Sequence, residues 1–471
     1  MNKAPADHAH ARHIPPVIRC GGVLRDNLEG LLSAIVLVLI IRCYVFEPFR
    51  IPTCSMAPTL LGDHQSVECP NCDLPFDLNA QTEETGAVDP IVGRCPNCSK
   101  VFEVRDNALY PPRPRNPVAD MARGFIFKWR NDLDGGNRVI VNKYRAEWET
   151  PARWNIVVFK HQGRHGIWEN YIKRLVGLPG ETIQIRHGDI YINGEIARKP
   201  DEVQANLWQI VHDSRYPPEE PLRPAWERVH GASEYDKGDL VLEPDEAGRA
   251  EVEYAPHILD FPAYNGQRGE FNEWGGSDLY LPVGDLKLDV TVRMRDAGSA
   301  TLHIIEDDNR YTAVIGFGAG DTPTMLLAND EVLATDPLGC DPAAPHRIVF
   351  TNVDGQLTLD VDGQRLFEQE VVITLAEVEG VASRSGVALG CKGSPARFSQ
   401  VRLYRDLYYV VPASATDLRW QIPERNYYVL GDNTRKSSDS RIWGTFPEEL
   451  LIGSACVVWW PLSDLRAIPE R

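Results

Sequence analysis

The 471-residue sequence has no basic stripe and no block of lysines and arginines. Its formal net charge is -18, from 49 Lys and Arg against 67 Asp and Glu. Nucleic-acid-binding proteins gather basic side chains against the phosphate backbone, so nucleic acid is excluded as an expected partner. The acidity is local, because residues 201–410 hold 17 basic and 37 acidic residues while the rest of the chain holds 32 and 30.

A Gly-x-Ser-x-Gly motif, which presents the nucleophile in α/β-hydrolases, is also missing. A serine without a base is a poor nucleophile, so any serine chemistry here needs a different partner. A lysine can serve as the base if it is neutral. Without this motif, a catalytic serine would need another base, such as a lysine that its surroundings keep neutral.

One apolar stretch stands near the N-terminus, from Gly30 to Ile41, and continues past Arg42 to Phe46. No Ala-x-Ala cleavage site follows it, so a stable membrane span at 28–47 is favoured over a cleaved signal peptide or a buried core helix. Basic residues precede the span: Lys3, Arg12, Arg19 and Arg25. The positive-inside rule then predicts a cytoplasmic tail at 1–27, a single pass through the inner (cytoplasmic) membrane, and a catalytic part on the outer face.

Four of the ten cysteines form two tight pairs, Cys69-Pro70-Asn71-Cys72 and Cys95-Pro96-Asn97-Cys98. The pairs are separated by 22 residues, and a phenylalanine follows each pair by four positions. Two such knuckles suit one structural tetrathiolate zinc site in a zinc-ribbon-like insert at 67–103. Disulfides are the alternative, because an exterior location is oxidising.

Alternating strand patterns recur along the chain and predict a mainly β protein. They include Arg138–Asn142, Thr182–Arg186 and Lys287–Met294, with Asp354-Gly355 as a hairpin turn. The acidic segment 201–410 reads as a β-sandwich insert. Its run HRIVFTNVDGQLTLDVDGQRLF resembles concanavalin-like or laminin-G-like jelly rolls. Its role stays open between a passive spacer and a binding module for glycan, cell-wall material or a protein.

The candidate nucleophile is Ser55, in the short, proline-punctuated segment FRIPTCSMAPTL just after the apolar stretch. The candidate base is Lys173, which strand alternation turns toward the same face as Tyr171 and Leu175. Burial can bring the pKa of a lysine down to about 5 to 6. On its own segment, Lys173 is more typical of an ordinary surface lysine of a strand, and only the motifs elsewhere in the chain favour a base.

Four blocks in order resemble bacterial signal peptidase I, the leader peptidase family: RIPTCSMAPTL, GNRVIVNKY with PARWNIVVFK, NYIKRLVGLPGETI and GDNTRKSSDSRIWG. The resemblance implies Ser55 as nucleophile and Lys173 as general base of a membrane-anchored serine endopeptidase. Such an enzyme removes N-terminal signal peptides from secreted preproteins. A signal peptidase I-type β-fold core would then be divided among 48–66, 104–200 and 411–471.

The same resemblance assigns supporting roles. Thr53 and the Ser55 backbone N–H would form the oxyanion hole, Ser437 would hydrogen-bond the base, and four charged residues would brace the site: Arg174, Asp432, Asp439 and Arg441. Four positions would border pockets for small side chains, which implies Ala-x-Ala-like cleavage sites: Ile51, Pro52, Tyr171 and Ile172.

Some positions depart from the family pattern. Cys54 replaces a glycine beside the nucleophile, which restricts the backbone unless its φ is negative. Thr434-Arg435-Lys436 replaces Arg-Asp-Asn and adds two positive charges that would help to keep Lys173 neutral if they lie close.

Two alternatives accompany this interpretation. One is a membrane-anchored binding or display protein whose peptidase-like core is inert. The other is a self-cleaving repressor-type protease, which the missing DNA-binding helix pair disfavours.

Overall fold

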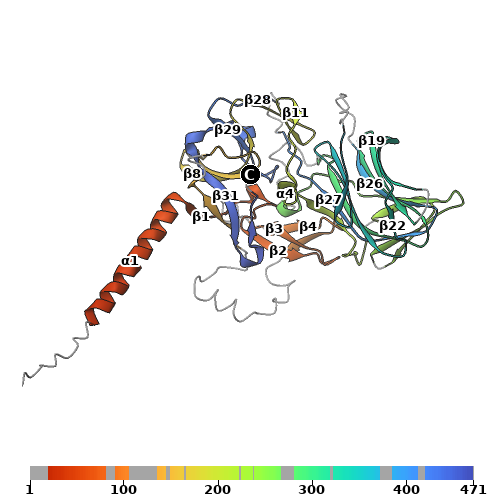
Figure 1. Ribbon diagram of the computed structural model, residues 1–471, viewed down its shortest axis with the longest axis horizontal. Helices are drawn as coiled ribbons and strands as arrows, with labels where there is room; N and C mark the ends of the chain where they lie inside the picture. Colours follow the sequence, from red (N-terminus) through yellow and green to blue (C-terminus); the bar gives the residue numbers. More distant parts are fainter. Residues whose placement is uncertain are drawn as a thin grey trace, which may run out of the picture.

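The computed structural model describes residues 20–80, 91–104, 135–144, 149–163, 166–221, 224–236, 238–266, 280–318, 322–371, 384–411 and 419–469. Strands dominate these residues, which confirms the prediction of a mainly β protein (Figure 1). The first 19 residues of the predicted cytoplasmic tail and the proline-rich stretch 105–120 lie outside the described residues.

Helix α1 (Cys20–Tyr44) projects away from the rest of the molecule (Figure 1). The chain then becomes extended as β1 (Phe46–Arg50), so the helix ends before the predicted boundary at 47. The helix could not continue through Pro48, because proline lacks the backbone N–H and its ring would clash with the carbonyl four residues earlier. Within the described ranges no helix combines the length and apolarity needed to cross a membrane, so the predicted span is not supported.

The strand that leads into the nucleophile segment and the strand that carries the base belong to one antiparallel sheet. Its order is β1, β6 (Arg138–Asn142), β31 (Leu451–Trp460), β7 (Ile156–Gln162), β8 (Trp168–Gly177), β29 (Asn426–Leu430) and β30 (Phe446–Pro447), with β32 (Arg466–Ala467) beside β31. Strand β8 becomes buried along its second half, where it lies between β7 and β29. The predicted base therefore sits in the middle of a sheet.

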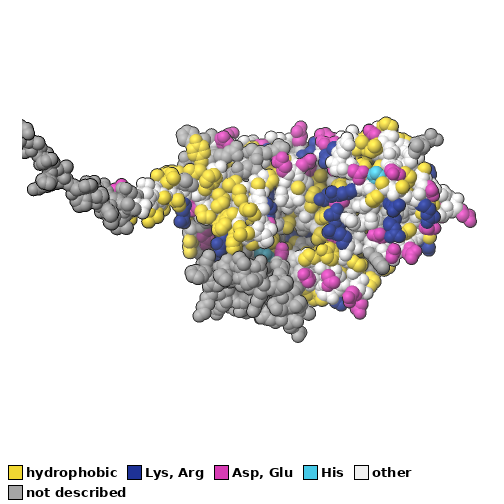
Figure 2. All heavy atoms as spheres, turned by 60° about the horizontal axis from the view of Figure 1, so that its bottom comes forward, with side chains coloured by type: hydrophobic (Ala, Val, Ile, Leu, Met, Phe, Trp, Pro, Cys, Tyr) yellow, Lys and Arg dark blue, Asp and Glu magenta, His cyan; other side chains and the backbone are white. Residues whose placement is uncertain are grey.

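A smaller sheet extends this body. Its order is β11 (Glu195–Ile196), β10 (Asp189–Ile192), β9 (Thr182–Arg186) and β28 (Arg419–Gln421). Short helical elements complete it: η1 (Cys54–Met56), α5 (Ser440–Trp443), η3 (Glu448–Leu450) and η4 (Leu462–Asp464). On the face of the molecule next to α1, Figure 2 shows a broad area of apolar side chains.

The acidic segment folds as two sheets packed face to face. The first contains β14 (Ala232–Asp236), β15 (Asp239–Glu243), β27 (Ala396–Arg405), β17 (Leu286–Met294), β23 (His346–Val353), β24 (Gln356–Val361) and β25 (Gln364–Glu370), with β12 (Gln209–Asp213) beside β27. The second contains β13 (Trp226–His230), β16 (Arg249–Tyr254), β26 (Ser385–Lys392), β18 (Gly298–Glu306), β19 (Asn309–Phe317), β20 (Thr324–Ala328) and β21 (Glu331–Asp336), with β22 (Gly339–Cys340) beside β19.

Alternation builds the core of this sandwich. Leu288 and Val290 of one sheet and Leu302 and Ile304 of the other are fully buried in a single apolar cluster. The predicted turn Asp354-Gly355 joins β23 to β24, and both residues have positive φ, as a tight two-residue hairpin requires. Helix α4 (Asp201–Gln204) precedes the sandwich along the chain.

Two small hairpins form a module of their own beside the acidic segment. They are β2 (His64–Glu68) with β3 (Pro75–Asn79), and β4 (Ile91–Arg94) with β5 (Val101–Val104). Phe76 and Phe102, the equivalent residues of the two repeats, pack edge to face with ring centres 6.1 Å apart. The one-turn element η2 (Ala263–Asn265), from the acidic segment, lies against β3.

Candidate active site

Ser55 lies in η1, at the centre of the proline-punctuated segment that follows β1. The residue is only 8% exposed. Its neighbour Cys54 is buried and is not among the described residues with positive φ, so a side chain is accommodated there. The departure from glycine therefore leaves the local backbone unstrained.

Lys173 lies on β8, and its Nζ is 2.7 Å from Ser55 Oγ across a separation of 118 residues. The same nitrogen donates to the Ile172 carbonyl oxygen at 2.9 Å. Lys173 is only 3% exposed, so the alternative of an ordinary surface lysine is wrong. Burial lowers the pKa of Lys173 to about 8, with Arg441 acting in the same direction and Asp439 opposing it.

Thr53 precedes η1 and is exposed, with its Oγ1 3.5 Å from Ser55 Oγ. Its hydroxyl thus borders the reacting oxygen from the solvent side. Such a position suits a donor that meets a developing oxyanion rather than one that holds the resting serine.

Two buried ion pairs support the site. Arg174 makes two hydrogen bonds to Asp432, at 2.8 and 2.6 Å, and Arg441 makes two to Asp439, at 2.9 and 2.7 Å. Burial alone would raise the pKa of Asp439, but Arg441 holds it below its ordinary value. Because Arg174 also donates to the carbonyl of Trp154 and the hydroxyl of Thr59, it connects several loops around the dyad.

Ser437 is buried close to the nucleophile through Gly431. A Cβ at Gly431 would collide with both Ser437 Oγ and the Ser55 carbonyl oxygen. Among the described hydrogen bonds none joins Ser437 to Lys173, so the implied bond to the base is not made here. Gly431 is a site residue that the sequence reasoning missed, although it begins the fourth block and only glycine fits this close approach.

The predicted pocket residues separate into two groups. Ile51 is buried in the core with Met56 and Leu60, so its side chain lies beneath the site rather than at its surface. Pro52 is exposed, while Tyr171 and Ile172 are half-buried next to the base. The Tyr171 ring centre lies 5.6 Å from Lys173 Nζ.

Arg435 forms an ion pair away from Lys173, contrary to the expectation from the sequence. Its guanidinium pairs with the buried carboxylate of Asp260 at 2.6 Å, in the acidic segment. The cation that lowers the pKa of Lys173 is Arg441 instead. Sequence position could not show this, because Asp260 is 175 residues away.

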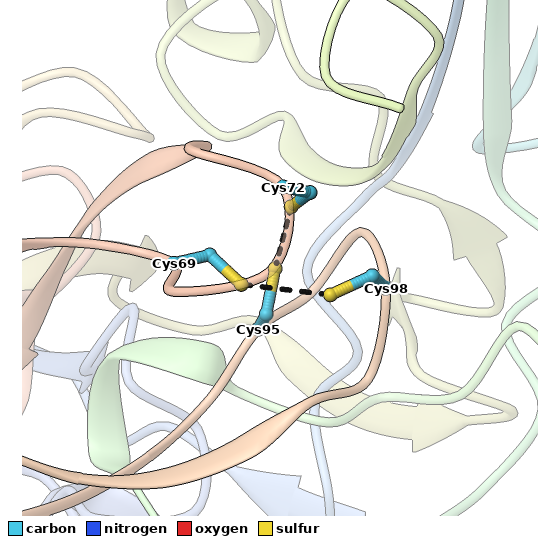
Figure 3. A group of neighbouring side chains, drawn as sticks. All are labelled: Cys69, Cys72, Cys95 and Cys98. Atoms are coloured by element: carbon cyan, nitrogen blue, oxygen red, sulfur yellow. Dashed lines mark hydrogen bonds between the residues drawn. The ribbon is translucent and has the colours of Figure 1, made fainter. Parts of the chain in front are cut away.

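The four paired cysteines come together with free thiols (Figure 3). Cys69 Sγ lies 3.5 Å from Cys98 Sγ, and Cys72 Sγ lies 3.6 Å from Cys95 Sγ. These separations exceed a disulfide bond of about 2.05 Å and approach the edge of about 3.8 Å of a zinc tetrathiolate with bonds of about 2.3 Å. The cluster therefore has the donor set and spacing of a closed metal site.

Comparison with known proteins gives a family match in two parts. Residues 129–241 and 397–460 match the family "Signal peptidase, peptidase S26". These ranges contain Lys173 and Asp439, but they do not reach Ser55. The matched parts lie on either side of most of the sandwich.

Curated relatives match over short stretches. Signal peptidase I of Haemophilus influenzae is 38% identical over 64 residues, which cover 14% of this chain and 18% of that protein. Signal peptidase I of Leptolyngbya laminosa is 33% identical over 100 residues, which cover 18% of this chain and 49% of that protein. Signal peptidase I V of Bacillus subtilis is 38% identical over 65 residues, which cover 14% of this chain and 36% of that protein. The chain thus spans half or less of the length of these relatives.

Solved structures match at low similarity. The carbohydrate binding module CBM66 from Bacillus subtilis is 12% identical, with a TM-score of 0.27, over 38% of this chain and 93% of that one. A Bacillus subtilis protein of unknown function with a galectin-like fold is 12% identical, with a TM-score of 0.28, over 39% of this chain and 90% of that one. The family match and the curated relatives, by contrast, support a peptidase of the signal peptidase I type.

Proposed function

We propose that this chain is a serine endopeptidase that removes N-terminal signal peptides from secreted preproteins. The observation that carries the proposal is the 2.7 Å contact between Lys173 Nζ and Ser55 Oγ, with both side chains buried. A pKa of about 8 leaves about a tenth of the Lys173 side chains neutral at pH 7, a far larger share than the ordinary pKa of 10.5 allows. That neutral amine is what a general base requires.

The proposed mechanism is acyl transfer. Lys173 takes the proton of the Ser55 hydroxyl as Oγ attacks the scissile carbonyl, and the lysine then gives a proton to the leaving amine. The Thr53 hydroxyl and the Ser55 backbone N–H would stabilise the oxyanion. Water activated by the again neutral Lys173 would release the acyl-enzyme. The exposed position of Thr53 beside Ser55 Oγ supports this assignment.

The proposed substrates carry small residues before the cleaved bond, in Ala-x-Ala-like sites. Pro52, Tyr171 and Ile172 would border the pockets, since they are accessible next to the dyad. Ile51 would set the depth of a pocket from below, because it is buried beside the nucleophile segment.

We also propose that α1 holds the enzyme at a lipid bilayer, with the catalytic part on the outer face of the inner membrane. Among the described side chains of α1, nine large aliphatic ones are exposed: Leu28, Leu31, Leu32, Ile35, Val36, Leu37, Val38, Leu39 and Ile40. The stretch from Ala34 to Ile40 is apolar on every side of the helix, which calls for an apolar environment, and in the described chain its large side chains are exposed. The apolar area beside α1 in Figure 2 agrees with the same location.

The metal proposed for the four-cysteine cluster is structural zinc. Four thiolates would fill its tetrahedral coordination and leave no position for water, so the ion would stabilise the module rather than act on substrate.

The proposal is tested with purified full-length protein in detergent and a preprotein with an Ala-x-Ala cleavage site. Ser55→Ala and Lys173→Ala should each abolish cleavage, because each removes one half of the dyad. Ser399→Ala, a serine of the sandwich that bonds the Thr291 carbonyl, is the matched control and should cleave normally. Cleavage by either dyad variant at the wild-type rate would refute the mechanism, and an inactive wild type would favour the inert display protein.

A further inference from the structure

The acidic segment reaches the backbone of the nucleophile through one asparagine. Asn265, at the end of η2, exchanges two hydrogen bonds with Asn433 of the fourth block. Asn265 Nδ2 donates to Asn433 Oδ1 at 2.9 Å, and Asn433 Nδ2 donates to Asn265 Oδ1 at 2.6 Å. The two side chains are 7% and 4% exposed, so water does not compete for these bonds.

Asn433 also forms hydrogen bonds to the nucleophile loop, residues 54–60 around Ser55. Its Nδ2 also donates to the Cys54 carbonyl at 3.0 Å, and its backbone N–H donates to the Ser55 carbonyl at 3.1 Å. An amide nitrogen has two hydrogens, and both are now used. The orientation of the Asn433 side chain is therefore fixed by Asn265 on one side and by Cys54 on the other.

The segment that carries Asn265 is itself held in place. Asp260 forms its ion pair with Arg435, two residues after Asn433. At the other end, Gly266 has φ +64°, and a Cβ there would lie 2.6 Å from the Val92 carbonyl of β4. The four-cysteine module thus packs closely behind η2, and the fourth block packs in front of it.

If the Asn265–Asn433 contact only joined the sandwich to the peptidase body, it would be enough for the two surfaces to fit. The bonds described here do more, because they end on the carbonyls of Cys54 and Ser55, the two peptide carbonyls on either side of the nucleophile's α-carbon. A shift of about 1 Å in a reacting group can lower a rate about 100-fold. The contacts are thus placed where small movements would change catalysis.

We propose that Asn265 is a positioning residue of the dyad, which acts through Asn433 to hold Ser55 Oγ within reach of Lys173 Nζ. The acidic segment is then part of the active site's support rather than a passive spacer. This inference rests on the proposed peptidase function and deepens it, since it assigns the insert a task in that reaction.

The first test compares Asn265→Ala with Asn309→Ala in the full-length protein, on the same Ala-x-Ala preprotein. Asn309 accepts a hydrogen bond from Asn329 in the sandwich, so its loss also breaks an amide pair but leaves the nucleophile loop alone. We expect Asn265→Ala to lower kcat about 10- to 100-fold with KM changed less than about twofold. The variant Asn309→Ala should match the wild type.

The pH profile separates positioning from a loss of folded protein. A loosened nucleophile loop admits water to Lys173 and raises its pKa, so the rising limb of kcat/KM should move to higher pH in Asn265→Ala. A smaller folded fraction would lower kcat and leave the limb in place, and that result would overturn the proposal. Asn265→Asp, which keeps the acceptor for Asn433 Nδ2 but loses the donor, should fall between wild type and Asn265→Ala.

Backbone hydrogen exchange of residues 54–60 provides a readout that does not require cleavage. Asn265→Ala should speed exchange at Ala57 and Leu60, whose N–H groups bond Cys54 and Met56, while Asn309→Ala should not. Unchanged exchange would overturn the positioning role even if activity fell. If the wild type itself fails to cleave, the peptidase proposal fails, and the exchange result still decides whether Asn265 holds the loop.

Discussion

Burial of the Lys173 amine leads to a quantitative prediction about how the folding stability depends on pH. The pKa of this amine falls from 10.5 to about 8 in the folded protein, which at 1.36 kcal/mol per unit corresponds to about 3 kcal/mol. The folded state binds its proton less readily than the unfolded chain, so the unfolded chain holds more protons between these two pKa values. Stability contributed by this group therefore rises with pH from about 8 to 10.5 and is at its minimum below 8.

The perturbation is Lys173→Met, which keeps the length of the side chain and removes the titrating group. Both proteins are unfolded in urea at pH 7 and pH 9.5, and the difference between their free energies of unfolding is measured. From the two pKa values, the wild type should gain about 2 kcal/mol relative to the variant between these pH values. Titrating groups that do not interact with Lys173 are shared by both proteins and cancel from the difference.

Lost hydrogen bonds to Ser55 and Ile172 shift the variant's stability at both pH values and leave the pH-dependent part unchanged. Leu175→Met on the same strand is the control, since neither side chain titrates and its difference from the wild type should stay constant. A constant difference for Lys173→Met as well would mean that the amine titrates as in water, and the reasoning from burial would be wrong.

Three further predictions concern Thr53, the cysteines and α1. Thr53→Val should lower kcat about 100- to 1000-fold by removing one oxyanion donor, while Thr53→Ser should keep most activity; equal rates for all three would exclude Thr53 from the oxyanion hole. Purified protein should contain one zinc per chain by elemental analysis, and Cys95→Ser should lower the zinc content and the melting temperature; zinc-free protein with four free thiols would refute the assignment. Leu37→Lys should weaken flotation with phospholipid vesicles by about 2 to 3 kcal/mol, whereas Leu37→Ile should float as the wild type does, and unchanged flotation of the lysine variant would argue against lipid contact by α1.

Local chemistry was predictable because it follows from short stretches of sequence. The knuckles around Cys69 and Cys95 repeat within one segment, and the Asp354-Gly355 turn follows from the φ values that these residues tolerate. Alternation of apolar residues likewise predicted the strands of the sandwich. The end of α1 was misjudged, since the apolar pattern continues to Phe46 whereas the chain is already extended at that residue.

The sequence by itself determined the candidate nucleophile, the candidate base and the β-rich character of the chain, because motif and periodicity act over a few residues. Only the tertiary structure decided that Lys173 is buried against Ser55, that Arg435 serves Asp260, and that Asn265 holds Asn433. Each of these contacts joins residues more than a hundred positions apart, and its existence depends on how sheets and inserts pack. Packing sets burial, and burial sets the charge state of the amine on which the proposed chemistry depends.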